Sequence, residues 1–235
     1  MISETEIKYI NALKVKKYRN KYLQFIAEGD KIIKELIAEG LEVVNIYTIN
    51  QVNSFPVEFT KVITEKQLAK ITALLHPHHS LAVFNLPSQK VTISPNEWVV
   101  LLDDIQDPGN MGTIIRTCDW FGVKKIICSD GCVDAFNPKV VQASMASVGR
   151  VQVIESVLLD ILEQYKFPVY GAVLNGKNYH EQSFSDKGFI LIGNEGHGIH
   201  PSLLAKITFP ITIPQKGKAE SLNAAIATAL ILDKL

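Results

Sequence analysis

The chain has 235 residues, with 24 basic and 24 acidic side chains and a formal net charge of zero. Apolar residues make up 47% and charged residues 20% of the sequence, an ordinary globular composition with enough material for a core. The amino-terminal stretch MISETEIKYINALK lacks the apolar segment of a signal peptide, and no apolar run approaches membrane-spanning length. A cytoplasmic protein is therefore expected.

The first 85 residues are predicted to form a small α/β domain. Its expected elements are, in chain order, a helix over 3–18, a strand over 22–26, a helix over 30–39, strands over 43–49 and 59–63, a helix over 64–75 and a strand over 80–84. The helix over 64–75 opens with a Thr-Glu-Lys-Gln capping box.

A basic cluster without an intervening acid lies near the end of the first predicted helix. It consists of Lys14, Lys16, Lys17, Arg19 and Lys21. A solvated helix face and a contact with RNA both explain such a cluster, and charge alone does not separate the two interpretations.

Residues 86–96 are mostly polar, contain two prolines and are predicted to link the first domain to a second one over 97–235. This second domain is predicted to have strands over 97–102, 125–128, 151–154, 169–174, 189–192 and 209–213, and helices over 111–121, from 138, over 156–165, from 201 and over 221–232. Gly122 is expected to follow the first of these helices, and Asn137, Ser156 and Ser221 are expected to cap later ones. Strands that alternate with helices indicate an α/β sheet with right-handed crossovers.

Three glycine-bearing loops follow strands of the second domain, after residues 102, 192 and 213. Ligands in open α/β sheets bind at the carboxyl ends of the strands, so the three loops predict one composite pocket. The second loop carries Gly193, Gly196 and Gly198, which run in the reverse order of the dinucleotide-binding fingerprint. A nucleotide-binding oxidoreductase is therefore disfavoured.

The polar residues of these loops each have an ordinary explanation when taken singly. Arg116 carries a planar, permanently charged group suited to phosphate. Glu195 is expected to stabilise its loop, and His197 is either a catalytic base or a solvent-exposed loop residue. Ser221 is explained by helix capping alone.

Neither a metal site nor a disulfide framework is favoured by the sequence. His76, His78 and His79 lack matching acidic or cysteine partners. The three cysteines, at positions 118, 128 and 132, form no C-x-x-C pair and are expected to be buried small apolar residues.

The combination of loops is more specific than any one of them. The segments LLDDIQDPGNMGTIIRTCDWFG, LIGNEGHGI and IPQKGKAESLNAAIATAL, in this order, resemble the three motifs of the SpoU/TrmH-type RNA ribose 2′-O-methyltransferases of the SPOUT superfamily. The segment YLQFIAEGDKIIKELI is similar to the opening of the ribosomal-protein-like substrate-binding domain that many members carry.

The resemblance implies a deep trefoil knot in the second domain, S-adenosylmethionine as the cofactor, and a homodimer with pockets at the subunit interface. It implies cofactor contacts at Gly193, Ile213 and Leu222. The residues that match the catalytic positions of the family are Asn110, Arg116, Glu195, Ser221 and Asn223. It also implies a first domain that binds RNA, with Lys14, Lys16, Lys17 and Arg19 as the expected contacts.

The implied activity is methylation of ribosomal RNA. In such a reaction Arg116 would clamp the phosphate beside the reacting ribose, and a requirement for the 2′-hydroxyl would make the enzyme selective for RNA. A transfer RNA substrate and an inactive knotted RNA-binding protein remain as alternatives. Gln142 stands where the family often has an arginine, which leaves the affinity for RNA open.

Overall fold

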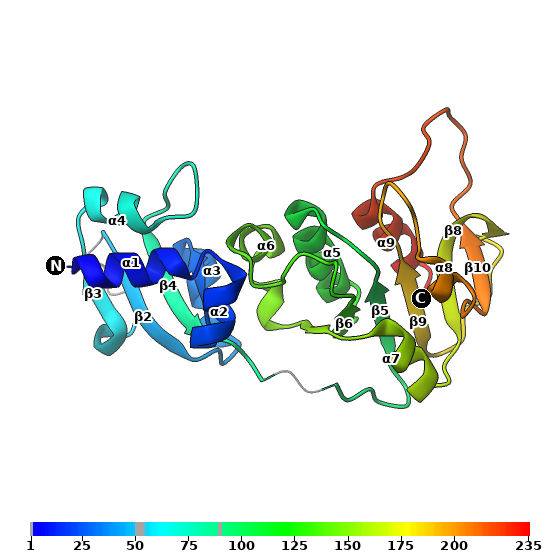
Figure 1. Cartoon of the computed structure of the whole chain (residues 1–235), viewed down its shortest axis with the longest axis horizontal. Coiled ribbons are helices and arrows are strands. Elements are labelled where there is room, and N and C mark those ends of the chain that lie inside the picture. Colours follow the sequence, from blue (N-terminus) through cyan, green and yellow to red (C-terminus); the bar gives the residue numbers. More distant parts are fainter. Residues whose placement is uncertain (1, 50–54, 89–90) are drawn as a thin grey trace. The chain divides into compact units, whose positions relative to one another are not determined.

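The computed structural model describes residues 2–49, 55–88 and 91–235. They form two compact units, one of Met1–Ser88 and Asp134–Gly149, the other of Gln89–Val133 and Arg150–Leu235 (Figure 1). The predicted linker over 86–96 includes Gln89 and Lys90, which lie outside the described residues. Within the described ranges, no helix has the length and apolar character needed to cross a membrane.

The first unit is built on a four-stranded sheet in the order β1-β4-β2-β3. Its strands are β1 (Gln24–Glu28), β2 (Val43–Thr48), β3 (Thr60–Val62) and β4 (Ser80–Asn85). Strand β4 pairs antiparallel with β1 and β2, whereas β2 and β3 are parallel. Its helices are α1 (Glu4–Ala12), α2 (Lys16–Tyr22), α3 (Asp30–Ala38), α4 (Glu65–Ile71) and α6 (Pro138–Ser144), with short 3₁₀ turns at Val57–Phe59 and Ser147–Gly149.

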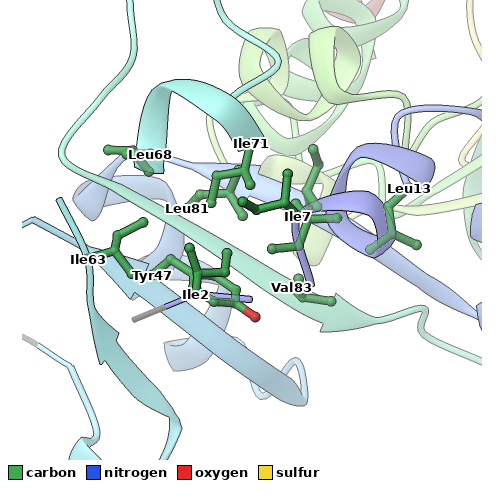
Figure 2. Close-up of a cluster of buried hydrophobic side chains, with 11 residues drawn as sticks. Ile2, Ile7, Leu13, Tyr47, Ile63, Leu68, Ile71, Leu81 and Val83 are labelled. Atoms are coloured by element: carbon green, nitrogen blue, oxygen red, sulfur yellow. The ribbon is translucent and has the colours of Figure 1, made fainter. Parts of the chain in front are cut away.

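The core of this unit lies between the sheet and helices α1 and α4. Ile7 and Ile10 of α1 face inward beside Leu68 and Ile71 of α4. Figure 2 shows Ile7, Leu68 and Ile71 gathered over side chains of the sheet, Tyr47, Leu81 and Val83 among them. The capping box predicted at the start of α4 is confirmed, because the Thr64 hydroxyl accepts a hydrogen bond from the Gln67 amide and the Gln67 side chain accepts one from the Thr64 amide.

The single helix predicted over 3–18 is wrong. The chain instead forms α1 and α2, which are separated by a turn in which Leu13 is buried and Val15 is extended. Leu23 then adopts a left-handed conformation with φ 53°, which ends α2 and moves the start of β1 to Gln24. No glycine or proline marks this turn, so the break depends on burial of Leu13 rather than on a local signal.

A segment of the second predicted domain belongs to the first unit. Residues Asp134–Gly149 follow β6 in the sequence but belong to the first unit, to which they contribute α6. The Asp134 carboxylate lies 2.6 Å from the Arg19 guanidinium, and the Phe136 ring lies 4.8 Å from the ring of Phe25. The sequence analysis did not anticipate this arrangement.

The second unit is an α/β structure on a six-stranded sheet in the order β10-β8-β9-β5-β6-β7. The strands are β5 (Trp98–Leu102), β6 (Lys125–Cys128), β7 (Gln152–Glu155), β8 (Val169–Asn178), β9 (Gly188–Ile192) and β10 (Phe209–Thr212), and every pair is parallel. The predicted parallel sheet is therefore confirmed. The helices are α5 (Pro108–Trp120), α7 (Leu158–Gln164), α8 (Pro201–Leu204) and α9 (Ala224–Leu232), of which α9 packs against α5.

Several helix ends in this unit differ from the prediction by a few residues. Helix α5 begins earlier than expected because Asp107 caps it, and Gly122, with φ 76°, follows its last turn as predicted. The predicted cap at Ser156 is wrong, because Val157 occupies the N-cap position of α7 without a side-chain hydrogen bond. Ser221 is likewise not a cap, since Asn223 takes that position in α9.

Candidate active site

The carboxyl edge of the parallel sheet positions the site. Because all six strands run in the same direction, the loops after β5, β9 and β10 leave from the same edge. These loops carry the residues that the sequence analysis assigned to one pocket. The structure thus supports the composite arrangement that was expected from strand and loop order alone.

Three predicted catalytic residues form one hydrogen-bonded chain across these loops. The Asn223 side-chain amide donates to Asn110 Oδ1 at 2.8 Å. The Asn110 side-chain amide in turn donates to Glu195 Oε1 at 2.5 Å. The chain joins the first turn of α5, the loop after β9 and the cap of α9, which lie 85 and 113 residues apart in sequence. A carboxylate at its end can orient both amides.

Local structure holds each end of this chain in place. Asp107 accepts a hydrogen bond from the Asn110 backbone at 2.8 Å, which fixes the start of α5. The Asn223 side-chain oxygen accepts from the amides of Ala225 and Ile226 at 3.0 and 3.2 Å. The one side chain of Asn223 therefore both caps α9 and reaches the first loop.

Arg116 lies on the exposed side of α5. It forms no hydrogen bond or ion pair with any other residue that the structure describes. Six residues, about 1.7 helical turns, separate it from Asn110 on the same helix. A permanently charged guanidinium without a protein partner is available for an anionic ligand.

Asn194 organises the second loop, a role that the sequence analysis assigned to Glu195. The Asn194 side-chain oxygen accepts from the Gly196 amide at 2.8 Å, and its side-chain amide donates to the Asp104 carbonyl at 2.8 Å. The backbone of Asn194 also pairs with Gly198. An asparagine between glycines just after a strand was the sequence signal for this turn.

Gly193 is required by close backbone contact. A Cβ atom at this position would lie 2.4 Å from the Gly198 carbonyl carbon and 2.5 Å from the Ile199 nitrogen. Ile213 directly follows β10 and is half-buried, whereas Leu222 lies just before α9 and is exposed. The three predicted cofactor residues therefore sit at the strand ends and helix start that bound the site. Ser221 is exposed in the same loop and caps nothing.

A cavity of about 600 Å³ lies nearby, beyond the carboxyl ends of β5, β6 and β7. Asp103, Asp104 and His200 are among its lining residues, and none of the predicted catalytic or cofactor residues is. His197 also lines it, and its Nε2 atom lies 2.9 Å from Asp104 Oδ2. His197 is mostly exposed, as the loop-residue interpretation expects.

The predicted RNA contacts of the first unit fall into two groups. Lys16 and Lys17 are exposed at the start of α2. Lys14 is half-buried and donates to the Thr72 carbonyl at 2.6 Å, and burial lowers the pKa of its ammonium group. Arg19 is only 2% exposed and is paired with Asp134, so its assignment as an RNA contact is wrong: its guanidinium is already neutralised inside the unit.

The cysteines are buried with free thiols, which confirms the interpretation that they are packing residues. Burial raises the pKa of the Cys118 thiol, so this sulfur stays protonated and unreactive. In the described part of the chain, no group of three or more histidine, cysteine or acidic residues is arranged to hold a metal ion.

Comparisons with known proteins agree with this geometry. Residues 97–233 match the family model of the SpoU rRNA methylases, and residues 4–82 match that of an MRM3-like substrate-binding domain. The chain is 30% identical to the 23S rRNA (guanosine(2553)-2′-O)-methyltransferase RlmP of Bacillus subtilis, over 97% of this chain and 94% of that protein.

Solved structures are similar over the whole chain. A TrmH-family RNA methyltransferase of Porphyromonas gingivalis superposes with a TM-score of 0.89 at 33% identity, over 100% of this chain and 98% of that one. An AdoMet-bound rRNA methyltransferase of Sinorhizobium meliloti superposes with a TM-score of 0.89 at 30% identity, over 100% of this chain and 95% of that one.

Proposed function

Because the chain belongs to the SpoU rRNA methylase family, we propose that it transfers a methyl group from S-adenosylmethionine to a ribose 2′-oxygen of ribosomal RNA. The observation that carries this proposal is the hydrogen-bonded chain of Asn223, Asn110 and Glu195, together with Arg116 on the helix of Asn110, which has no hydrogen-bond or ion-pair partner among the described residues. Ribosomal RNA is favoured over transfer RNA because the B. subtilis relative, which aligns with 97% of this chain, is named as a 23S rRNA enzyme.

The loops around the site fit a cofactor held by backbone groups. Apart from Pro214, which has no backbone N–H, the backbone N–H groups of residues 213–222 donate to no acceptor in the described part of the chain. Gly193 has no side chain that could cover the backbone of its loop, and Ile213 and Leu222 offer apolar surface. When bound, S-adenosylmethionine supplies an electrophilic methyl group on sulfonium. Gly193, Ile213 and Leu222 are the residues that we propose hold it.

The protein's contribution to the reaction is to position the ribose and stabilise charge. A 2′-hydroxyl is a poor nucleophile at neutral pH, so alignment of its oxygen and loss of its proton limit the rate. We assign Arg116 to clamp the adjacent phosphate and to stabilise negative charge that develops on the 2′-oxygen. Acceptance of the 2′-hydroxyl proton by Arg116 is the alternative to a role as clamp alone, and it requires a neutral guanidine, a form that is rarely populated in proteins.

The remaining predicted catalytic residues orient this arginine and the substrate. Asn110 lies six residues before Arg116 on α5 and is held by hydrogen bonds with Glu195 and Asn223. We propose that these hydrogen bonds hold the three loops in fixed positions relative to one another when RNA and cofactor bind. Ser221, which is exposed and caps no helix, is free to contact substrate or cofactor.

A homodimer and a trefoil knot are also part of the proposal. Exposed apolar side chains lie on α5 and α9, where Trp120 is 85% and Ile226 is 50% exposed. Two helices that pack together and carry such residues are suited to bury them against a second copy. Packing of the last helix, α9, on α5, the first helix of the unit, supports a chain end that is tucked into the fold.

We propose that residues 1–85 bind the RNA and that residues 97–235 carry out the methyl transfer. The match to a substrate-binding domain over 4–82 supports the first part. Lys16 and Lys17 are its exposed cations near α2, with the partly engaged Lys14 beside them. We also propose a cytoplasmic location, which the similarity to the 23S rRNA methyltransferase of B. subtilis supports.

The function is tested by calorimetry and by methyl transfer. Purified protein is titrated with S-adenosylmethionine or its demethylated product, with NADH as a control ligand. Tritium transfer from labelled S-adenosylmethionine is then measured on ribosomal and transfer RNA. Micromolar binding of the methyl cofactor and label in the ribose of ribosomal RNA are expected. A folded protein that binds no methyl cofactor would instead support the inactive RNA-binding alternative.

The variant Arg116→Ala tests the catalytic assignment. Methyl transfer is expected to fall by at least 100-fold while cofactor binding and thermal stability stay unchanged, because the exposed side chain has no protein partner among the described residues. Lys124→Ala, which removes an exposed cation from the same unit, is the matched control. Near-normal turnover of Arg116→Ala would contradict its role.

A further inference from the structure

Helix α2 carries aromatic and basic side chains in adjacent stripes. Tyr18 and Tyr22 are four residues apart and share one side of the helix, as Lys17 and Lys21 share the next. Arg19 points to the interior and is anchored by Asp134, with its guanidinium also donating to the Leu13 carbonyl at 2.9 Å. This anchor fixes the rotation of the helix and so decides which stripes face outward.

The two tyrosine rings are arranged as a platform. Their centroids are 6.5 Å apart and their planes differ by 18°. Tyr18 is 37% exposed and Tyr22 is 40% exposed. The edge of Tyr9 contacts the Tyr22 ring at a centroid distance of 5.3 Å, and the Tyr9 hydroxyl donates to the Gln24 side chain. Tyr22 is thus packed against Tyr9 while 40% of it stays exposed.

Positive charge lies next to these rings. The Lys21 ammonium is 5.4 Å from the centroid of the Tyr22 ring, and Lys16 and Lys17 are exposed one turn earlier. The sequence from Leu13 to Leu23 contains no acidic residue. Exposed aromatic rings beside lysines are the combination that binds unpaired nucleotides, with bases on the rings and phosphates at the cations.

We propose that Tyr18 and Tyr22 form a stacking site for unpaired bases of the substrate RNA, with Lys17 and Lys21 contacting the phosphates on either side. The inference rests on the proposed function, which supplies the RNA, and adds to it that the first unit selects an unpaired segment rather than a duplex. A paired base is already stacked between its neighbours and offers only its edges, so a flat aromatic surface discriminates against it.

The experiment measures binding of the full chain to two fluorescent RNAs, a twelve-nucleotide single strand and a blunt duplex of the same length. The variant Tyr18→Leu/Tyr22→Leu keeps apolar volume but removes both rings. It is expected to weaken single-strand binding about 5- to 100-fold while leaving duplex binding within about twofold. The variant Tyr18→Phe/Tyr22→Phe keeps both rings and is expected to restore single-strand binding.

The salt dependence of RNA binding distinguishes the contribution of the tyrosine rings from that of the lysines. Lys17→Gln/Lys21→Gln is expected to reduce the slope of log affinity against log salt for the single strand by about 0.7 per lysine, whereas the leucine variant leaves that slope unchanged. Lys66→Gln, at an exposed position of α4, is the control for an unrelated cation of the same unit. Thermal melting checks that each variant is folded.

Because Tyr22 also packs on Tyr9, its replacement can disturb folding, so a further variant changes Tyr18 alone. Tyr18→Trp keeps an aromatic ring, so its binding is expected to match the unchanged protein and its added fluorescence to be quenched by the single strand. Unchanged single-strand affinity of the leucine variant, or no quenching of Tyr18→Trp on binding, would overturn the stacking site while the methyl-transfer assay still tests the enzyme. Absence of any RNA binding by the unchanged protein would overturn both.

Discussion

Asn223 has two separable roles, and replacing it by aspartate removes only one of them. Its side-chain oxygen caps α9 through the amides of Ala225 and Ile226, and its side-chain nitrogen donates to Asn110 Oδ1 at 2.8 Å. In Asn223→Asp one carboxylate oxygen can still accept from the helix, but the second oxygen replaces the nitrogen, so no donor remains for Asn110. A carboxylate then faces the Asn110 carbonyl oxygen at the same distance, and the repulsion displaces the Asn110 side chain.

The effect on stability should be small. Loss of one hydrogen bond costs about 0.5–1.5 kcal/mol, and a negative charge at a helix N-terminus contributes about 0.3–1 kcal/mol in return. The free energy of unfolding should therefore stay within about 1 kcal/mol of the unchanged protein. Asn223→Ala loses the cap as well, at about 1 kcal/mol, so its melting temperature should fall by about 4–8 °C.

The effect on catalysis should be larger. Displacement of Asn110 removes the group that orients Glu195 and that lies six residues before Arg116 on α5. We expect the kcat/KM for methyl transfer to ribosomal RNA to fall about 10- to 100-fold in Asn223→Asp, which corresponds to about 1.4–2.7 kcal/mol of transition-state stabilisation. The assay combines steady-state transfer of labelled methyl groups with thermal melting of each variant.

Asn137→Asp is the matched control, because Asn137 also caps a helix by accepting from a backbone amide, that of Lys139 at 3.0 Å. Asn137 belongs to the first unit and is not part of the three loops that form the site, so its replacement should keep full activity. Wild-type kcat/KM in Asn223→Asp would refute the role of the hydrogen-bonded chain. So would an activity loss of equal size in Asn137→Asp.

Three further predictions follow from the packing. Gly193→Ala should weaken binding of the methyl cofactor more than about tenfold in calorimetry, because its Cβ would lie 2.4 Å from the Gly198 carbonyl carbon and displace the loop; unchanged cofactor affinity would contradict this role. Arg19→Met should cost about 3–5 kcal/mol of unfolding free energy in urea denaturation, because it leaves a carboxylate without its buried partner; a loss below 1 kcal/mol would contradict the buried ion pair. The Lys61 ammonium lowers the pKa of Glu6 from 4.5 to about 2, so Glu6→Gln should lose about 0.2–1 kcal/mol of unfolding free energy at neutral pH. This difference is fully present above pH 4.5 and disappears as the pH falls to about 2. Melting curves of both proteins, recorded at a series of pH values, will check it.

Local patterns predicted most elements of the second unit correctly. The apolar runs that became β5 and β9 are buried on both faces, as the near-continuous hydrophobic sequence indicated. Gly122 ended α5 because a left-handed residue after a helix is a local property of the chain. The helix caps were less predictable, since several adjacent residues can cap a helix and packing selects among Ser221, Leu222 and Asn223.

The candidate site was predicted as a set of loops but not as a set of contacts. Strand order placed the loops at one edge, and the motif resemblance selected Asn110, Glu195 and Asn223. Their hydrogen bonds join residues 85 and 113 positions apart, so no periodicity or spacing contains them. The role of Asn194 in ordering its loop was missed for the same reason, because its link to Asp104 crosses 90 residues.

The sequence by itself determined the alternation of strands and helices, the three loops and the family, because these depend on the order of residue types along the chain. The tertiary structure alone decided that Asp134–Gly149 completes the first unit and that Arg19 is an internal anchor rather than an RNA contact. An arginine in a basic cluster is expected to be solvent-exposed, but folding here brings a carboxylate from 115 residues away into contact with it. The charge of a side chain can be read from the sequence, but its burial is a property of the packed chain, and burial decides whether the charge contacts solvent or a protein partner.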